Sequence, residues 1–234
     1  MGKITDSNHW LELRDGNKIR TTEFESSFKS WGSNFKGPLL ELGSGDGTQY
    51  KQLKQYIDNI TPSDVNTDYW PAELGEIKNI NAEKMPFEDG SFKTIYSSNV
   101  LEHIPDVDTA LVEMKRILDK NGAMIHIVPT VTWKLLQLGL YHVSLVRNWI
   151  AKGKRLERFR PCLIHGVSKS SIEEIGRFKG SYWRKRFNGA GLKIVDTKCL
   201  LTYSPYRFTP NFILLRSILA KIGFASTKAY LIHK

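Results

Sequence analysis

A short apolar run at residues 39–42 leads directly into Gly43, Gly45 and Gly47, and this junction constrains the fold more than any other segment. Glycines at alternate positions allow positive φ angles and leave room for a ligand to approach the backbone. An amphipathic segment follows from Thr48, so the pattern predicts a buried strand, a tight turn and a helix. Such a turn can hold a nucleoside-like cofactor, although a dinucleotide fold would space its glycines as G-x-G-x-x-G.

The length and the cysteine content limit the number of domains and the kinds of site that the chain can contain. A chain of 234 residues suits one α/β domain with insertions, and two independent domains would be cramped. Cys162 and Cys199 lack a C-x-x-C partner or a histidine spacing typical of zinc sites, which argues against a disulfide framework and a metal site. Neither a signal-peptide pattern nor a run of 18 apolar residues occurs. We therefore expect a cytoplasmic protein without a bound metal.

Charge is distributed unevenly along the chain. The formal net charge is +10, but residues 1–130 hold 14 Lys and Arg against 20 Asp and Glu, whereas residues 131–234 hold 20 against 4. This asymmetry indicates that residues 131–234 meet an anion such as lipid headgroups, pyrophosphate or nucleic acid. Lysines scattered over solvated faces are the simpler alternative.

Strand-like and helix-like patterns alternate, which predicts an α/β fold with a Rossmann-like, doubly wound parallel sheet. Expected strands lie at 39–42, 63–67, 77–80, 94–98, 123–128, 192–200 and 229–233, with the second ending at Asp68 and the fifth following an Asn121-Gly122 turn. Expected helices include 48–59 and 107–118. We divide the chain into an N-terminal cap helix (1–37), a core (38–130), an insertion with a helix (131–190), and two final strands (191–234) around an insertion at 201–226.

The cap helix is expected because aromatic residues recur at helical spacing before residue 37. Trp10 comes first, and Phe24, Phe28, Trp31 and Phe35 then follow at intervals of four, three and four. This spacing is typical of an amphipathic helix that packs on a domain.

Three downstream blocks extend the glycine motif: NAEKMPFEDGSF at 81–92, SSNVLEHIPD at 97–106 and EMKRILDKNG at 113–122. Together with Glu41 and the glycines they resemble, in wording and spacing, the class I S-adenosylmethionine (SAM) dependent methyltransferases, of the methyltransferase domain type 11 kind. The resemblance runs from about residue 38 to 130. It implies a seven-stranded sheet with an antiparallel last strand, SAM as cofactor and methyl transfer as activity.

The resemblance also implies a set of cofactor contacts. These are Glu41, Gly43, Ser44, Gly45, Asp68, Tyr69, Asn81, Ala82, Glu83, Ser98 and Asn99. Asp68 would accept both ribose hydroxyls from the end of the second strand, and an ordinary turn aspartate is its alternative. Ala82 and Glu83 would flank adenine, beside Asn81, which stands where the family often has aspartate. An amide can also pair with an adenine edge.

Two histidines are candidate catalytic residues. The methyl group of SAM is already activated, so an enzyme mainly aligns the acceptor and removes its proton. His165 lies in an Ile-His-Gly sequence within the region where acceptor specificity is normally built. His103 lies near the cofactor by the motif match, and a structural role is the alternative for it.

Residues 131–234 carry a second resemblance, through His165-Gly166, SYWRKRF at 181–187 ahead of GAGL at 189–192, and an insertion rich in tyrosine and proline. These features are similar to methyltransferases of bacterial surface polysaccharide biosynthesis. That similarity implies O-methylation of a saccharide or glycolipid acceptor, with residues 131–234 on the anionic inner membrane face as a peripheral contact. A natural-product methyltransferase, an RNA methyltransferase without a recognised RNA-binding module, and a non-catalytic SAM-binding subunit remain alternatives.

Overall fold

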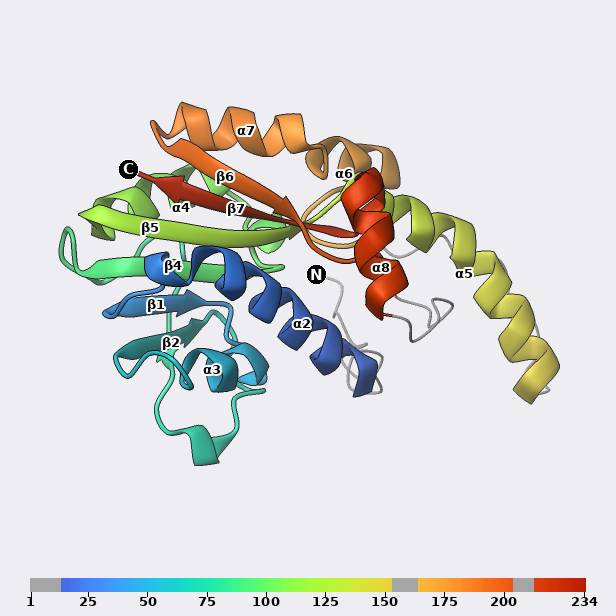
Figure 1. The fold of residues 1–234 in the computed structure, drawn as a ribbon, viewed down its shortest axis with the longest axis horizontal. Helices are drawn as coiled ribbons and strands as arrows, with labels where there is room; N and C mark the ends of the chain where they lie inside the picture. Colours follow the sequence, from blue (N-terminus) through green and yellow to red (C-terminus); the bar gives the residue numbers. More distant parts are fainter. Residues whose placement is uncertain (1–13, 153–163, 204–212) are drawn as a thin grey trace.

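The computed structural model describes residues 14–152, 164–203 and 213–234, which form one sheet with helices on both faces (Figure 1). The sheet has seven strands in the order β3-β2-β1-β4-β5-β7-β6. Strand β7 runs antiparallel to both of its neighbours, whereas the remaining pairs are parallel. The predicted doubly wound, Rossmann-like sheet with an antiparallel last strand is therefore confirmed.

The elements have the following bounds. The strands are β1 (Leu39–Leu42), β2 (Ile60–Asp64), β3 (Lys78–Asn79), β4 (Phe92–Ser98), β5 (Leu118–Pro129), β6 (Lys193–Cys199) and β7 (Thr227–His233). The α-helices are α2 (Arg14–Trp31), α3 (Thr48–Leu53), α4 (Val107–Ile117), α5 (Val131–Lys152), α6 (Ser171–Arg177), α7 (Gly180–Gly189) and α8 (Ile213–Leu219). Short helical turns are η1 (Gly32–Asn34), η2 (Ala72–Leu74), η3 (Leu101–His103) and η4 (Ala220–Phe224).

Each face of the sheet has its own hydrophobic core, because side chains alternate along a strand. On β5, Met124 and Val128 join the core that includes side chains of α4 and α7. Ile125 and Ile127, one residue out of phase, join the core that includes side chains of α2 and α3. The parallel strands are thus covered on both faces, as their apolar sequences predict.

The predicted N-terminal helix is α2, and its aromatic side chains pack on the sheet as the spacing indicated. Phe24, Trp31 and Phe35 are buried, and Phe28 packs against the same core. Trp10 lies outside the described residues. The division of the chain into four segments stays a prediction.

The second strand was predicted wrongly. It spans Ile60–Asp64 rather than residues 63–67, and its pairing with β1 joins Leu42 to Ser63. Two consecutive turns then take the chain out of the sheet. Asp64 Oδ1 accepts a hydrogen bond from the Asn66 amide at 3.0 Å, and Asn66 Oδ1 accepts one from the Asp68 amide at 2.9 Å. Such side-chain turns compete with strand pairing, so the strand ends four residues before Asp68.

Two other predicted boundaries also differ. Helix α3 ends at Leu53 instead of residue 59, and a tight turn follows in which the Tyr56 amide donates to the Leu53 carbonyl at 3.0 Å. The Asn121-Gly122 pair does not precede β5 but lies within it, where the register against β4 shifts. A Cβ at Gly122 would lie 2.9 Å from the Lys93 carbonyl oxygen, so this close strand contact requires glycine.

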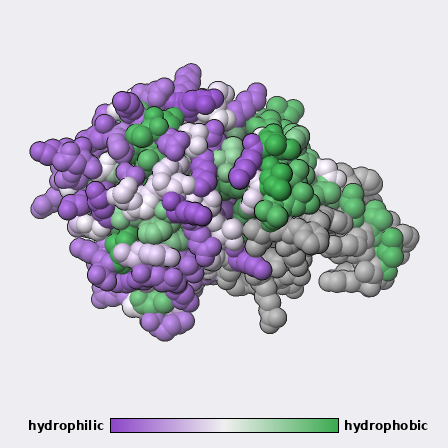
Figure 2. Space-filling view, viewed as in Figure 1, coloured by the Kyte–Doolittle hydropathy of each residue, from purple (hydrophilic) through white to green (hydrophobic). Residues whose placement is uncertain are grey.

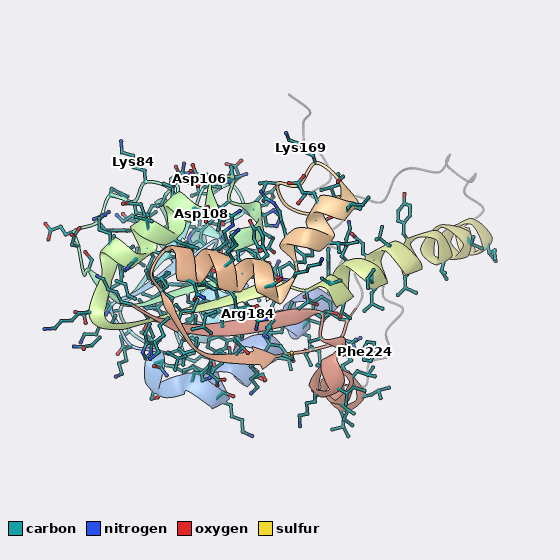
Figure 3. The ribbon with its side chains drawn as sticks, turned by 90° about the horizontal axis from the view of Figure 1, so that it is seen from above. Lys84, Asp106, Asp108, Lys169, Arg184 and Phe224 are labelled. Atoms are coloured by element: carbon teal, nitrogen blue, oxygen red, sulfur yellow. The ribbon has the colours of Figure 1, made fainter. Side chains whose placement is uncertain are left out.

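Helix α5 begins in the core and then extends away from the sheet (Figures 1 and 3). Its first turns bury Trp133, Lys134 and Gln137, whereas Val143, Val146 and Ile150 are exposed farther along. The first part of the insertion expected at residues 131–190 is thus helical up to Lys152. The basic residues from Lys154 to Arg160 lie outside the described residues.

Exposed apolar side chains gather on α8, η4 and the outer part of α5, where Figure 2 shows a green surface. In α8 and η4 they are Leu214, Leu215, Ile218, Ile222 and Phe224. Within the described ranges, no helix combines the length and the hydrophobicity that crossing a bilayer requires.

Candidate functional site

The glycine turn lies between β1 and α3, at the edge of the sheet where the parallel strands end. Gly43, Gly45 and Gly47 have φ angles of 73°, 51° and 74°. A Cβ at Gly43 would lie 2.2 Å from Val100 Cγ2, so the turn packs tightly on the segment that follows β4. Beside Gly45, by contrast, no described atom lies within 4 Å of a Cβ position. The turn is therefore closed on one side and open where a ligand can approach.

Glu41 anchors this turn from within the sheet. Its side chain is buried, and its Oε2 accepts a hydrogen bond from Ser44 Oγ at 2.8 Å. Ser44 Oγ in turn accepts a bond from the Ser63 amide at 3.1 Å, which links β1 to β2. Burial raises the pKa of Glu41 to about 8, and the hydrogen bond from Ser44 opposes that shift. The carboxyl group is thus largely protonated at neutral pH.

The acidic residue at the end of β2 is Asp64 and not Asp68. Asp64 Oδ2 accepts a hydrogen bond from the Gly45 amide at 2.9 Å, so this carboxylate touches the glycine turn directly. Asp68 is exposed in the loop beyond, and Tyr69 beside it is 50% exposed. The prediction that placed Asp68 at the strand end is therefore wrong, because the strand was placed three residues too late.

The remaining predicted cofactor contacts lie after β3 and at the end of β4. Asn99 has a positive φ of 54° and donates through its side-chain amide to Ser98 Oγ at 3.2 Å. Asn81 Oδ1 accepts a hydrogen bond from the Glu83 amide at 2.9 Å. Glu83 Oε1 accepts one from the Asp106 amide at 2.9 Å and so holds this loop, which includes Ala82, against the start of α4. Figure 3 shows Lys84 and Asp106 projecting on the same side of the molecule as Lys169.

His103 and His165, predicted independently from distant segments, lie side by side. Their ring centroids are 4.5 Å apart. Both Nε2 atoms face Glu102 Oε1, at 4.0 Å from His103 and 3.6 Å from His165. Glu102 is buried, although the sequence reading did not single it out. Burial lowers the pKa of His103, the nearby Glu102 opposes this shift, and His165 adds to it.

Val100 connects the cluster of Glu102, His103 and His165 to the glycine turn. Val100, which packs on Gly43, is only two residues before Glu102. Trp133 from α5 adds an aromatic wall, with its ring centroid 4.8 Å from that of His165. The sheet edge therefore brings together an open glycine turn, two acids and a pair of histidines.

Comparison with known proteins identifies the kind of domain that contains the glycine turn. A family model described as a methyltransferase domain matches residues 40–126. The chain carries a class I SAM-dependent methyltransferase domain. SAM is the cofactor that this family implies.

Relatives agree with this domain. A ubiquinone biosynthesis O-methyltransferase of Bartonella bacilliformis is 24% identical over 119 residues, which are 50% of this chain and 45% of that protein. The chain thus spans less than half the length of this relative. Among solved structures, a SAM-dependent methyltransferase of Aquifex aeolicus has a TM-score of 0.58 at 14% identity, covering 96% of both chains. One of Mesorhizobium loti has a TM-score of 0.56 at 14% identity, covering 89% of this chain and 96% of its own.

The matched methyltransferase domain contains the glycine turn, Asp64, Glu102 and His103 but neither Trp133 nor His165. Asp64 could have been found from its place after the apolar Ile60 and buried Pro62, had the strand been started at residue 60. Glu102 offered no signal in the sequence except its position beside His103. Its burial depends on the loop at residues 165–167, which only the fold brings into contact.

Proposed function

We propose that this chain transfers the methyl group of SAM to a hydroxyl oxygen of a saccharide or lipid-linked glycan. The observation that carries the proposal is the packing of Val100 on Gly43, because Glu102 and His103 follow shortly after Val100 and His165 lies against them. A group that handles the acceptor has to lie within reach of the cofactor's reactive end. The short connection from Val100 to the cluster supports this role for Glu102, His103 and His165.

The cofactor would lie along the carboxyl edge of the sheet. Gly43, Ser44 and Gly45 would line its amino acid end above Glu41. Asp64 would accept the two ribose hydroxyls, because a carboxylate has about four acceptor sites and Gly45 and Asn66 occupy two of them. A further set of residues would border the ribose and adenine: Asp68, Tyr69, Asn81, Ala82, Glu83, Ser98 and Asn99.

The proposed chemistry needs one proton acceptor from the protein. When bound, SAM supplies an electrophilic methyl group, and its sulfur keeps the electrons of the broken carbon–sulfur bond. His165 would accept the hydroxyl proton of the acceptor at Nε2 as the oxygen forms its bond to carbon. Glu102 would orient this imidazole and stabilise its positive charge, in the manner of a carboxylate–histidine pair. His103 would support the same proton transfer from the other side of Glu102.

A surface feature supports a lipid-linked glycan acceptor. The exposed apolar side chains of α8 and η4 come with Lys221, a combination that suits the headgroup region of an anionic leaflet. The named relative acts on oxygen, which agrees with O-methylation. We therefore propose peripheral contact with the inner face of a membrane.

Labelled SAM incubated with membrane glycolipid extracts tests this function. We expect label in the glycolipid fraction, and we expect His165→Ala to lower the rate by about 10²- to 10⁴-fold. His233→Ala is the control, because His233 lies at the opposite edge of the sheet. Thermal shifts with SAM should stay equal in both variants. Transfer only to RNA or to soluble small molecules would overturn the glycan assignment, and transfer to no acceptor would overturn the activity.

A further inference from the structure

Glu102 is a buried carboxylate without an ordinary partner. Its side chain is 1% exposed, and neither carboxylate oxygen has a hydrogen bond with any residue that the structure describes. Burying a carboxylate costs free energy unless hydrogen bonds, an ion pair or a metal compensates it. The atoms that face it are the Nε2 atoms of two imidazoles, at distances longer than a hydrogen bond.

The side chains of Glu102, His103 and His165 lie close together. One ligand atom from each of Glu102, His103 and His165 lies within 4.8 Å of the others. Two imidazoles and one carboxylate form a donor set that divalent transition metals favour, with positions left for water or substrate. Mg²⁺ and Ca²⁺ prefer oxygen ligands throughout, so this set does not suit them.

The backbone around His165 is built to keep it in this place. The His165 amide donates to Glu174 Oε1 at 2.7 Å, and buried Glu174 is paired with Lys134. Gly166 has a φ of 88°, and a Cβ there would lie 2.4 Å from the Glu102 carbonyl oxygen. Glycine is therefore required for the loop to approach Glu102. Such supporting contacts are typical of ligand sites that are held in advance.

We propose that Glu102, His103 and His165 bind one divalent first-row transition metal ion, such as Zn²⁺ or Mn²⁺. Ligand atoms around one such ion lie about 3.0–3.4 Å apart, so the cluster has to contract slightly. His103 can supply this movement because its side chain is 46% exposed. This assignment rests on the proposed function and changes one step of it: with Nε2 of His165 bound to the ion, His165 would no longer accept the proton. The ion would instead polarise the acceptor hydroxyl, whose proton would leave to solvent water.

No metal site was expected from the sequence, because its two cysteines lack the spacing that is typical of zinc ligands. His103 and His165 are far apart in the chain, and only the loop at Gly166 brings them to one carboxylate. A ligand set of this kind has no sequence signature. Val100, which packs on Gly43, is two residues before Glu102, and this connection to the glycine turn supports a role in the reaction.

Metal titration of the full chain tests the site. Protein stripped with EDTA would be titrated with Zn²⁺ and Co²⁺ by calorimetry, with visible absorption as a second readout for Co²⁺. We expect one ion per chain for wild type and for His233→Ala. Glu102→Gln and His165→Ala should weaken binding at least tenfold, and Gly166→Ala should weaken it without removing a ligand. Equal binding by Glu102→Gln, His165→Ala and wild type, or no binding by wild type, would overturn the proposal.

The same samples separate this inference from the proposed function. A thermal shift with S-adenosylhomocysteine confirms that each variant is folded and holds the cofactor. Methyl transfer by EDTA-stripped protein at the full rate would overturn the metal role and leave the methyltransferase function intact. Failure of wild type to bind SAM at all would overturn the function, whatever the metal result.

Discussion

The cofactor side and the proposed acceptor side of this molecule are built in different ways. The cofactor side uses residues 41–47 and the ends of neighbouring strands, tied by short hydrogen bonds such as those from Ser44 to Glu41 and from Gly45 to Asp64. The acceptor side assembles Glu102, His103, Trp133 and His165 from three distant segments. The glycine turn of the cofactor side is formed by residues close together in the sequence and is held by tight packing. The acceptor side is formed by residues that only folding brings together.

This difference explains why the cofactor side can be recognised from the sequence and the acceptor side cannot. The glycine turn follows from steric rules that leave almost no choice of residue, so it can be recognised in the sequence. The acceptor side depends on side chains that many residue types could supply, and it is bordered by α5 and α8 with their exposed apolar surface. The cofactor is therefore identified by the family, whereas the acceptor has to be proposed.

We expect the largest effect on stability and SAM binding from Gly43→Ala, on the cofactor side. The new Cβ would lie 2.2 Å from Val100 Cγ2 at a φ of 73°, so we expect a loss of about 2–4 kcal/mol in stability and no measurable SAM binding. Chemical denaturation and calorimetry measure both effects. Gly139→Ala is the control, because it lies in α5 with no atom within 4 Å of a Cβ position and should be neutral or slightly stabilising.

A double variant shows whether the clash is the cause. Adding Val100→Ala to Gly43→Ala should restore part of the stability, because the atom in the way is removed. A purely additive loss in the double variant would contradict the packing account.

A second change distinguishes two acids on the cofactor side. Asp64→Asn should weaken SAM binding by about 10- to 100-fold, because hydrogen bonds to a charged group contribute about 1.5–3 kcal/mol. Asp68→Asn should change it less than threefold, since exposed Asp68 lies beyond the end of β2. Binding calorimetry with SAM measures both variants. The reverse order would support the prediction from sequence that Asp68 accepts the ribose hydroxyls.

The smallest expected effect is on the pH dependence of stability, through buried Glu41 on the cofactor side. The pKa of Glu41 is about 8 in the folded chain, against 4.5 without the fold, so the folded state retains a proton that the unfolded state releases. Stability from this group is complete below pH 4.5 and is lost as the pH rises through 8. Melting scans between pH 6 and 9 should show a smaller decline for Glu41→Gln, by about 2–5 °C.

Glu25→Gln, an exposed change in α2, is the matched control and should follow wild type. Part of the decline should persist in Glu41→Gln because burial also raises the pKa of Glu23, to about 7. Identical slopes for Glu41→Gln and wild type would mean that Glu41 does not retain its proton.

Much of the fold followed from patterns in the sequence. Strand β1 and helix α4 lie where apolar periodicity placed them, because their burial is encoded residue by residue. Strand β2 was misplaced because its half-polar sequence, ITPSD, gives a weak pattern and two Asx turns follow it. In the candidate site, His103 and His165 were singled out from sequence, but the approach of His165 to Glu102 depends on Gly166 and on a long-range loop contact. Tertiary contacts of this kind produce no local sequence pattern from which they could be predicted.

The most direct measurement is a calorimetric titration of wild type, Gly43→Ala and His165→Ala with SAM, followed by a transfer assay on the same samples. The account predicts that wild type and His165→Ala bind one SAM per chain with affinities within about threefold, whereas Gly43→Ala does not bind. Only wild type should transfer the methyl group at the full rate. Loss of SAM binding in His165→Ala, or full transfer by that variant, would contradict the separation of cofactor and acceptor sides.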